Sequence, residues 1–233
     1  MQINNSGFTL LELLIVVAVL ATLAGGVILS LGGIEDDTSL NLSKNEMLEI
    51  KKALIRFKQD TGFLPRQGPF DLAPPNGSGV VPLPVEGENW FKSPANFSQI
   101  YENPLASTTH FLRAWNPDTS RGWRGPYLTQ HGEGLVDLGN GLNADGTGSP
   151  IAGTTLLLNI RGVADPFVMQ PEPCPPLGNC FVWRTIASSP AHFRWGRPYF
   201  LFNLNDPLQA RIVGMGADGT YGTTDDLSLF LFK

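Results

Sequence analysis

Three carboxylates close to the end of the chain have the residue type and the spacing to bind a metal ion. Asp218, Asp225 and Asp226 lie in the glycine-rich segment 215–226, between two stretches that are typical of β-strands. Carboxylates that are held together repel one another unless a cation neutralises them, and hard cations such as Ca²⁺ prefer oxygen ligands. The segment therefore indicates a calcium loop, and a solvated acidic turn is the alternative interpretation.

A further carboxylate, Glu12, is the single charged residue of the apolar stretch 7–34. A helix of about 20 apolar residues is enough to cross the hydrocarbon core of a membrane. A carboxylate inside that core costs roughly 2.5–3.5 kcal/mol on insertion scales. We therefore expect Glu12 to have a functional role and a charged partner.

The residues before this apolar stretch have an unusual order. A secretory signal places its small-residue cleavage site after the apolar core, whereas here Gly7 precedes that core. The sequence GFTLLE, from Gly7 to Glu12, resembles the class III leader of type IV pilins and pseudopilins. The resemblance implies that prepilin peptidase cleaves the chain before Phe8 and that the new amino group is methylated. It also implies that Glu12, one helical turn further on, neutralises the amine of a neighbouring subunit during filament assembly.

The C-terminal acidic segment is similar to the calcium loop of the major pseudopilins of type II secretion. That similarity implies that Asp218, Asp225 and Asp226 are the side-chain ligands, with backbone carbonyls near Met215 and Thr220 as further ligands. Two short stretches between the termini also resemble sequence motifs of the pseudopilin core. These are Arg124-Gly125-Pro126-Tyr127-Leu128 and Asp165-Pro166-Phe167.

Two other groups of residues allow more than one interpretation. Cys174 and Cys180 are separated by five residues with Pro and Gly among them, which favours a disulfide made in an oxidising compartment over two free thiols. Segment 137–145 offers four oxygen-bearing side chains that could bind a second calcium ion, but the same residue types are common in turns, and we favour turns. These residues are Asp137, Asn140, Asn143 and Asp145.

The elements that position these residues follow from proline content and hydrophobic spacing. The first 64 residues contain no proline and the remainder contains all 19, so the N-terminal part can form a long helix. From Leu40 onward, apolar residues recur at helical spacing and predict an amphipathic helix that ends at Gly62 and Pro65. These residues are Leu40, Met47, Ile50, Leu54 and Phe57. Ser43 and Glu46 would form a capping box if the helix restarts there.

The predicted fold class is α+β, with a long N-terminal helix packed on a small antiparallel C-terminal sheet and a large loop-rich insertion, as in pilins. The stretches 197–204, 210–216 and 226–233 predict the three strands of that sheet. A short helix is expected around residues 94–102. The predicted parts are a leader (1–7), a transmembrane and assembly helix (8–34), an amphipathic helix (35–62), a loop-rich variable region (63–196) and a C-terminal sheet with the calcium loop (197–233).

These observations favour a structural subunit of a type IV pilus-like filament, specifically a type II secretion pseudopilin. The alternative is a minor pilin that acts as a membrane-anchored binding or adhesion module. The expected partners are other copies of the chain, other pilins or pseudopilins, prepilin peptidase, the membrane and the assembly platform of the bacterial inner membrane. The precursor is expected in that membrane and the mature chain in a periplasmic or surface filament.

Other function classes find little support in the sequence. The net charge is −5 and no basic block is present, so no nucleic-acid partner is expected. The three histidines, His110, His131 and His192, form no metal-binding or catalytic motif, so the sequence does not predict an enzyme.

Overall fold

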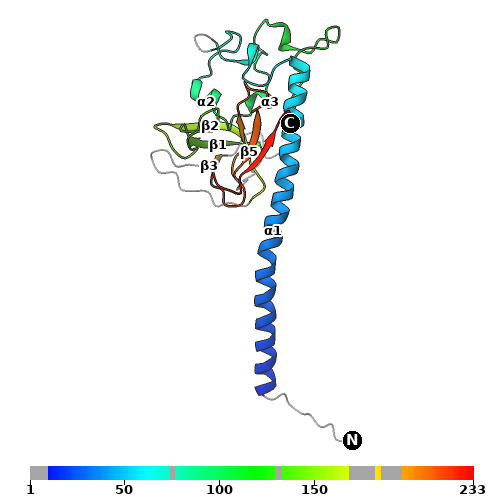
Figure 1. The fold of residues 1–233 in the computed structure, drawn as a ribbon, viewed down its shortest axis with the longest axis vertical. Helices are drawn as coiled ribbons and strands as arrows, with labels where there is room; N and C mark the ends of the chain where they lie inside the picture. The colour runs from blue at the N-terminus through cyan, green and yellow to red at the C-terminus, as the bar shows by residue number, and fades with distance from the viewer. Residues whose placement is uncertain (1–9, 74–76, 130–132, 168–181, 185–195) are drawn as a thin grey trace. The chain divides into compact units, whose positions relative to one another are not determined.

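The computed structural model describes residues 10–73, 77–129, 133–167, 182–184 and 196–233. The chain forms two compact units, Met1–Ser39 and Leu40–Lys233. Helix α1, Leu10–Thr61, contributes residues to both (Figure 1). The helices and antiparallel strands confirm the predicted α+β class.

Within the second unit, the last part of α1 provides one wall of the main hydrophobic core. The side chains of Met47, Ile50, Leu54 and Phe57 are at most 2% exposed, as the amphipathic spacing predicts. Phe57 makes edge-to-face contacts with the rings of Phe70 and Tyr127, at centroid distances of 4.9 and 5.3 Å. Apolar burial of this kind is the dominant favourable term in folding.

Helix α1 ends where the sequence indicates. The last helical residue is Thr61, and Gly62 follows with φ of +88°, a conformation that a side chain would strain. The helix does not restart at Ser43, so the capping box is wrong. The hydroxyl of Ser43 instead shares a buried hydrogen bond of 2.9 Å with the hydroxyl of Tyr199, so it ties the helix to the C-terminal sheet.

The C-terminal sheet contains the three predicted strands in the order β4-β5-β6, all antiparallel. Their bounds are β4 Phe200–Phe202, β5 Arg211–Gly214 and β6 Leu227–Phe230. Leu201 pairs with Ile212, which pairs in turn with Leu229. Leu201 and Ile212 belong to the same core as the apolar face of α1.

The short strands expected in the middle of the chain are present among the described residues, and three of them pair with one another. They form a second antiparallel sheet with the order β2-β1-β3, in which Val136 and Ile160 are paired and fully buried. The strands are β1 Glu133–Gly139, β2 Leu156–Val163 and β3 Val182–Arg184. The sequence signal is weak because β1 contains two glycines and pairs with strands that lie far along the chain.

Short helical turns connect these sheets to α1. They are η1 Gly68–Phe70, α2 Glu88–Lys92, α3 Ser98–Tyr101 and η2 Phe111–Arg113. The helix expected around 94–102 is therefore shorter than predicted and is preceded by a second one. Trp90 and Trp123 pack against the core.

Part of the stretch 8–34, predicted to cross a membrane, lies outside the residues that the structure describes, so this prediction remains open. Among the described residues, no helix is both long and apolar enough to span a membrane.

Candidate functional site

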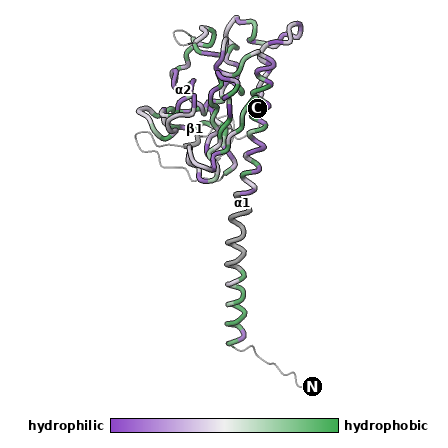
Figure 2. Tube along the Cα trace, in the orientation of Figure 1, coloured by the Kyte–Doolittle hydropathy of each residue, from purple (hydrophilic) through white to green (hydrophobic). Residues whose placement is uncertain are grey.

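The first turns of α1 expose an almost continuous apolar surface. Between Leu10 and Leu23, ten large aliphatic side chains are each 50–83% exposed, and Figure 2 shows this part of the helix in the hydrophobic colour. Glu12 lies in the first helical turn, where the helix dipole favours a negative charge. Exposed apolar surface of this extent marks a region that contacts a membrane or other proteins.

The loop between β5 and β6 brings the three predicted carboxylates together. Gly216 begins the turn with φ of +68°, and a Cβ atom at this residue would lie only 2.4 Å from the backbone oxygen of Asp225. Only glycine fits there without displacing the chain. The backbone N–H of Asp218 then donates to Oδ2 of Asp225 at 3.0 Å, which closes the loop.

Loop hydrogen bonds already satisfy most of these carboxylate oxygens. Oδ1 of Asp218 accepts from the N–H of Thr220 at 2.7 Å, and Oδ2 of Asp226 accepts from the N–H of Gly222 at 2.8 Å. The Thr223 hydroxyl, 2.6 Å from Oδ1 of Asp225, lowers the pKa of that carboxyl, and the N–H of Asp218 lowers it further. Asp225 is therefore ionised at neutral pH.

Asp226 differs from the other two carboxylates. Burial raises its pKa, and the nearby charges of Asp225 and Asp218 raise it further. Its Oδ1 atom is buried and has no hydrogen-bond partner. Even so, no group of three or more acidic, histidine or cysteine side chains in the described residues is arranged to hold a metal ion.

The backbone carbonyls proposed as further ligands lie in the same loop. Met215 is fully buried in a second hydrophobic cluster, separate from the core that contains the apolar face of α1. The carbonyl of Thr220 accepts a hydrogen bond from the Thr223 hydroxyl at 3.0 Å. The carbonyl of Thr220 therefore already serves the fold of the loop.

Segment 137–145 serves local structure: the predicted turns follow residue 139, whereas Asp137 lies in a strand and not in a turn. Asp137 lies in β1, and its Oδ1 accepts from the N–H of Asn159 at 2.9 Å. Asn140 and Asp145 accept from backbone N–H groups of Thr155 and Thr147. Asn143 donates to the Thr147 hydroxyl.

Comparison with known families identifies a sequence motif at the N-terminus. Residues 3–28 match the family model described as the prokaryotic N-terminal methylation motif. The chain carries a prepilin-type N-terminus. The match includes Gly7, Phe8 and Glu12, and it confirms the pilin-like resemblance at this general level. No curated protein and no solved structure matches the chain.

This motif has consequences for processing and location. It is typical of type IV pilins and pseudopilins, and it implies cleavage by prepilin peptidase, pilus-like assembly, a precursor in the inner membrane and a mature chain outside the cytoplasm. Proteins with this motif are typically structural subunits. Four of the predicted residues, Gly7, Phe8, Cys174 and Cys180, lie outside the described residues.

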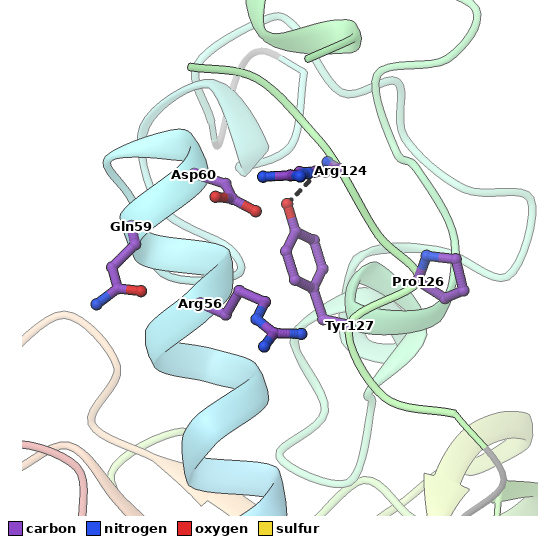
Figure 3. A pocket seen from close by; sticks show the side chains of 6 residues that line it. All are labelled: Arg56, Gln59, Asp60, Arg124, Pro126 and Tyr127. Atoms are coloured by element: carbon purple, nitrogen blue, oxygen red, sulfur yellow. Dashed lines mark hydrogen bonds between the residues drawn. The ribbon is translucent and has the colours of Figure 1, made fainter. Parts of the chain in front are cut away.

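Sequence reasoning missed one polar pocket at the end of α1. It is lined by Arg56, Asp60, Arg124 and Tyr127, among others. Arg124 and Tyr127 belong to the stretch 124–128, whose sequence resembles the pseudopilin core, but their proximity to Asp60 depends on tertiary structure (Figure 3).

Proposed function

We propose that the chain is a structural subunit of a type IV pilus-like filament, and specifically a pseudopilin of type II secretion. The observation that carries this proposal is the row of exposed aliphatic side chains over Leu10–Leu23. In the precursor this surface contacts lipid, and in the filament it packs against the same surface of other subunits. The methylation motif over residues 3–28 supports the same assembly route.

Glu12 has a specific role in this proposal. Its carboxylate pairs with the amino group of Phe8 of a neighbouring subunit after cleavage. An ion pair that forms away from water is costly to break by removal of one partner, because the other charge is left buried. Glu12 therefore favours one register of subunit packing.

The test is the amount of protein in sheared filaments for the variants Glu12→Ala and Glu12→Gln. Both variants should be processed normally but be strongly depleted from filaments. Glu49→Gln, which removes one carboxylate from an exposed position on the same helix, is the matched control and should assemble normally. Normal incorporation of both Glu12 variants would contradict the role.

The loop between β5 and β6 is proposed to bind a structural Ca²⁺ ion. The support is the unpartnered buried Oδ1 of Asp226, together with the raised pKa of that carboxyl beside Asp218 and Asp225. The ion would be held by these three carboxylates after a small rearrangement of the loop hydrogen bonds. An ion that binds only the folded chain stabilises it by mass action.

A chelator should therefore lower the melting temperature of the full chain in detergent, and added Ca²⁺ should restore it. The double variant Asp218→Ala, Asp225→Ala should melt at a lower temperature and should no longer respond to the chelator. Asp118→Ala changes an exposed carboxylate in another loop and should keep the full response. Equal chelator effects on the double variant and the unaltered chain would refute the site.

A minor pilin that displays its loops to a partner is the second candidate. The size of the region between α1 and the C-terminal sheet, which contains a sheet of its own, favours it. The number of copies distinguishes the two functions. A filament-forming pseudopilin should be abundant in the sheared filament fraction, whereas a minor pilin should be present in few copies per filament.

A further inference from the structure

A groove of about 480 Å³, which we call the Phe232 groove, lies at the C-terminal end of α1 beside the last residues of the chain. It is lined by Ile55, Lys58, Gln59, Gly62, Arg121 and Phe232. Two of these residues carry a positive charge and none carries a negative one. The pocket beside Asp60 (Figure 3), by contrast, contains a carboxylate. The Phe232 groove therefore suits an anionic group.

The two cations of the groove are held in defined positions. Nζ of Lys58 lies 4.2 Å from the centre of the Phe232 ring, in a cation–π contact. Nη1 of Arg121 donates a hydrogen bond of 2.9 Å to the backbone carbonyl of Gln59. Neither Lys58 nor Arg121 forms an ion pair with any residue that the structure describes, so both charges are available to a partner.

The groove also has an apolar part. The Phe232 side chain is 40% exposed and Ile55 is half-buried, so both present hydrocarbon surface near the cations. Removing such surface from water favours association. A matching partner therefore combines an exposed apolar side chain with a neighbouring carboxylate.

A projecting turn of the same unit has this complementary chemistry. The N–H of Gly87 donates to the carbonyl of Pro84 at 2.9 Å, which closes a turn with Val85 and Glu86 at its tip. Val85 is fully exposed, and Leu83, two residues earlier, is 57% exposed. Glu86 is exposed and forms no ion pair with the described residues. The turn thus offers an apolar side chain beside an unpaired negative charge.

Buried residues on both sides attach this turn to the core. Val81 precedes it and Phe91 follows it, and each is 5% exposed. The next carboxylate along the chain, that of Glu88, already pairs with Lys92 at 2.9 Å within α2. Glu86 is therefore the carboxylate that the turn offers to a partner. A turn that is already formed loses little conformational freedom when it binds.

We infer that the Val85–Glu86 turn of one copy of the chain docks into the Phe232 groove of a second copy. Val85 covers the exposed faces of Phe232 and Ile55, and the Glu86 carboxylate pairs with the two cations of the groove. Charge complementarity of this kind fixes the register of two surfaces and excludes other partners. The inference rests on the proposed function, because it supplies a contact between filament subunits.

The turn and the groove lie on different sides of the second unit. In Figure 1, α2, which directly follows the turn, lies away from the C-terminus of the chain, which lies beside α1. One copy can therefore offer its turn to one neighbour and its groove to another. A head-to-tail contact of this kind generates an open helical filament when its rotation does not close a ring.

The test is zero-length carbodiimide cross-linking, which joins an amine to a carboxylate only where the two are in contact. It is applied to sheared filaments and to the concentrated full chain in detergent, and covalent dimers and larger multimers are separated by mass. These multimers should contain a peptide in which Nζ of Lys58 is joined to the carboxyl group of Glu86. Lys58→Arg keeps the positive charge but has no amine to couple, so it should assemble normally and lose this link.

Variants measure what the contact contributes to assembly. Val85→Ser and Glu86→Lys should each lower the yield of filaments by roughly tenfold, as expected for the loss of one central interface contact. Lys58→Glu should have a similar effect, and its combination with Glu86→Lys should restore most of the yield. Leu208→Ser is the control, because it changes another largely exposed aliphatic side chain, in a different loop, and should assemble normally.

Two results would overturn the inference. Multimers in which Lys58 is unlinked, or is joined only to other carboxylates of this chain or of another protein, would give the groove a different occupant. A filament yield that Val85→Ser and Glu86→Lys leave unchanged would show that assembly does not use the contact. If the chain forms no filaments, the proposed function fails, and the detergent sample alone decides the inference. The Lys58–Glu86 link in its multimers would support the contact, and absence of the link would refute it.

Discussion

The two parts of helix α1 use the same kinds of residue for opposite purposes. Between Leu10 and Leu23, large aliphatic side chains are 50–83% exposed, whereas Ile50, Leu54 and Phe57 are fully buried. Both parts are helical and rich in leucine. The difference is that polar residues interrupt the later part and confine most of its large apolar residues to one face, which the second unit covers; Leu42 and Leu48 are exceptions.

This difference separates residues that stabilise the fold from residues that support assembly. Substitutions in the later part should lower the free energy of unfolding of the second unit. Substitutions in the early part should leave that quantity unchanged and affect incorporation into filaments instead. The predictions below test this separation, beginning with the largest expected effect.

Phe57→Ala should lower the free energy of unfolding by about 3–5 kcal/mol, because it leaves a cavity between Phe70 and Tyr127. Leu14→Ala should change it by less than about 0.5 kcal/mol, because that side chain is already exposed. Denaturant unfolding of the full chain in detergent, followed by tryptophan fluorescence, measures both. Comparable losses in the two variants would remove the distinction between the two parts of α1.

Gly216→Ala should lower the free energy of unfolding by roughly 1–3 kcal/mol, the usual cost of a strained backbone conformation. The added Cβ would also meet the backbone oxygen of Asp225 at 2.4 Å. Gly222→Ala is the control for backbone strain alone, since Gly222 has φ of +91° but no atom within 4 Å of an added Cβ, so its loss of free energy should be the smaller of the two. If both variants unfold at the same denaturant concentration, close packing at Gly216 does not shape the loop.

Tyr199→Phe should lower the free energy of unfolding by about 0.5–1.5 kcal/mol. The variant loses the buried hydrogen bond to Ser43 at 2.9 Å and the contact with Oε2 of Glu46 at 3.2 Å. A double-mutant cycle with Ser43→Ala isolates the first of these. Strict additivity of the two substitutions would mean that the hydroxyl pair does not tie α1 to the sheet.

The last prediction is a dependence of stability on pH that arises from Asp165. Burial raises the pKa of this carboxyl well above its usual range, and the charge of Glu46 adds to the shift. The N–H groups of Phe167 and Arg197 and the Arg197 charge oppose it. Because the folded pKa exceeds the unfolded one, the stabilising contribution is complete at low pH and is lost as pH rises through the folded pKa.

Melting temperatures of the unaltered chain should therefore fall as pH rises from the usual carboxyl pKa through the raised pKa of folded Asp165. They should fall less steeply for Asp165→Asn, which cannot titrate at this position. Parallel curves for the two proteins would show that Asp165 has the same pKa in the folded and unfolded chain.

Local sequence patterns predicted the local elements well. The stripe of apolar residues at helical spacing, the stop at Gly62 and the three aromatic-rich C-terminal strands each depend on neighbouring residues, and all are present in the structure. The β1-β2-β3 sheet was harder to predict because its strands pair across long loops. Ser43 shows the same limit, since its sequence suggests a cap but its partner, Tyr199, lies 156 residues away.

The candidate sites show the same division between features that depend on neighbouring residues and features that depend on tertiary contacts. Asp218, Asp225 and Asp226 are close in sequence and could be identified from spacing, as could Glu12 within its apolar stretch. The Asp60 pocket could not, because Asp60 and Tyr127 come together only when the chain between them has folded. The unpartnered oxygens of Asp60 and Asp226 are likewise visible only in the structure.

The most direct test of the filament assignment is mass spectrometry of the mature N-terminus in the sheared filament fraction. The account predicts a chain that begins at Phe8 with a methylated amino group, and recovery of this form in filaments. A chain that still begins at Met1, found only as dispersed single copies in the membrane fraction, would contradict it.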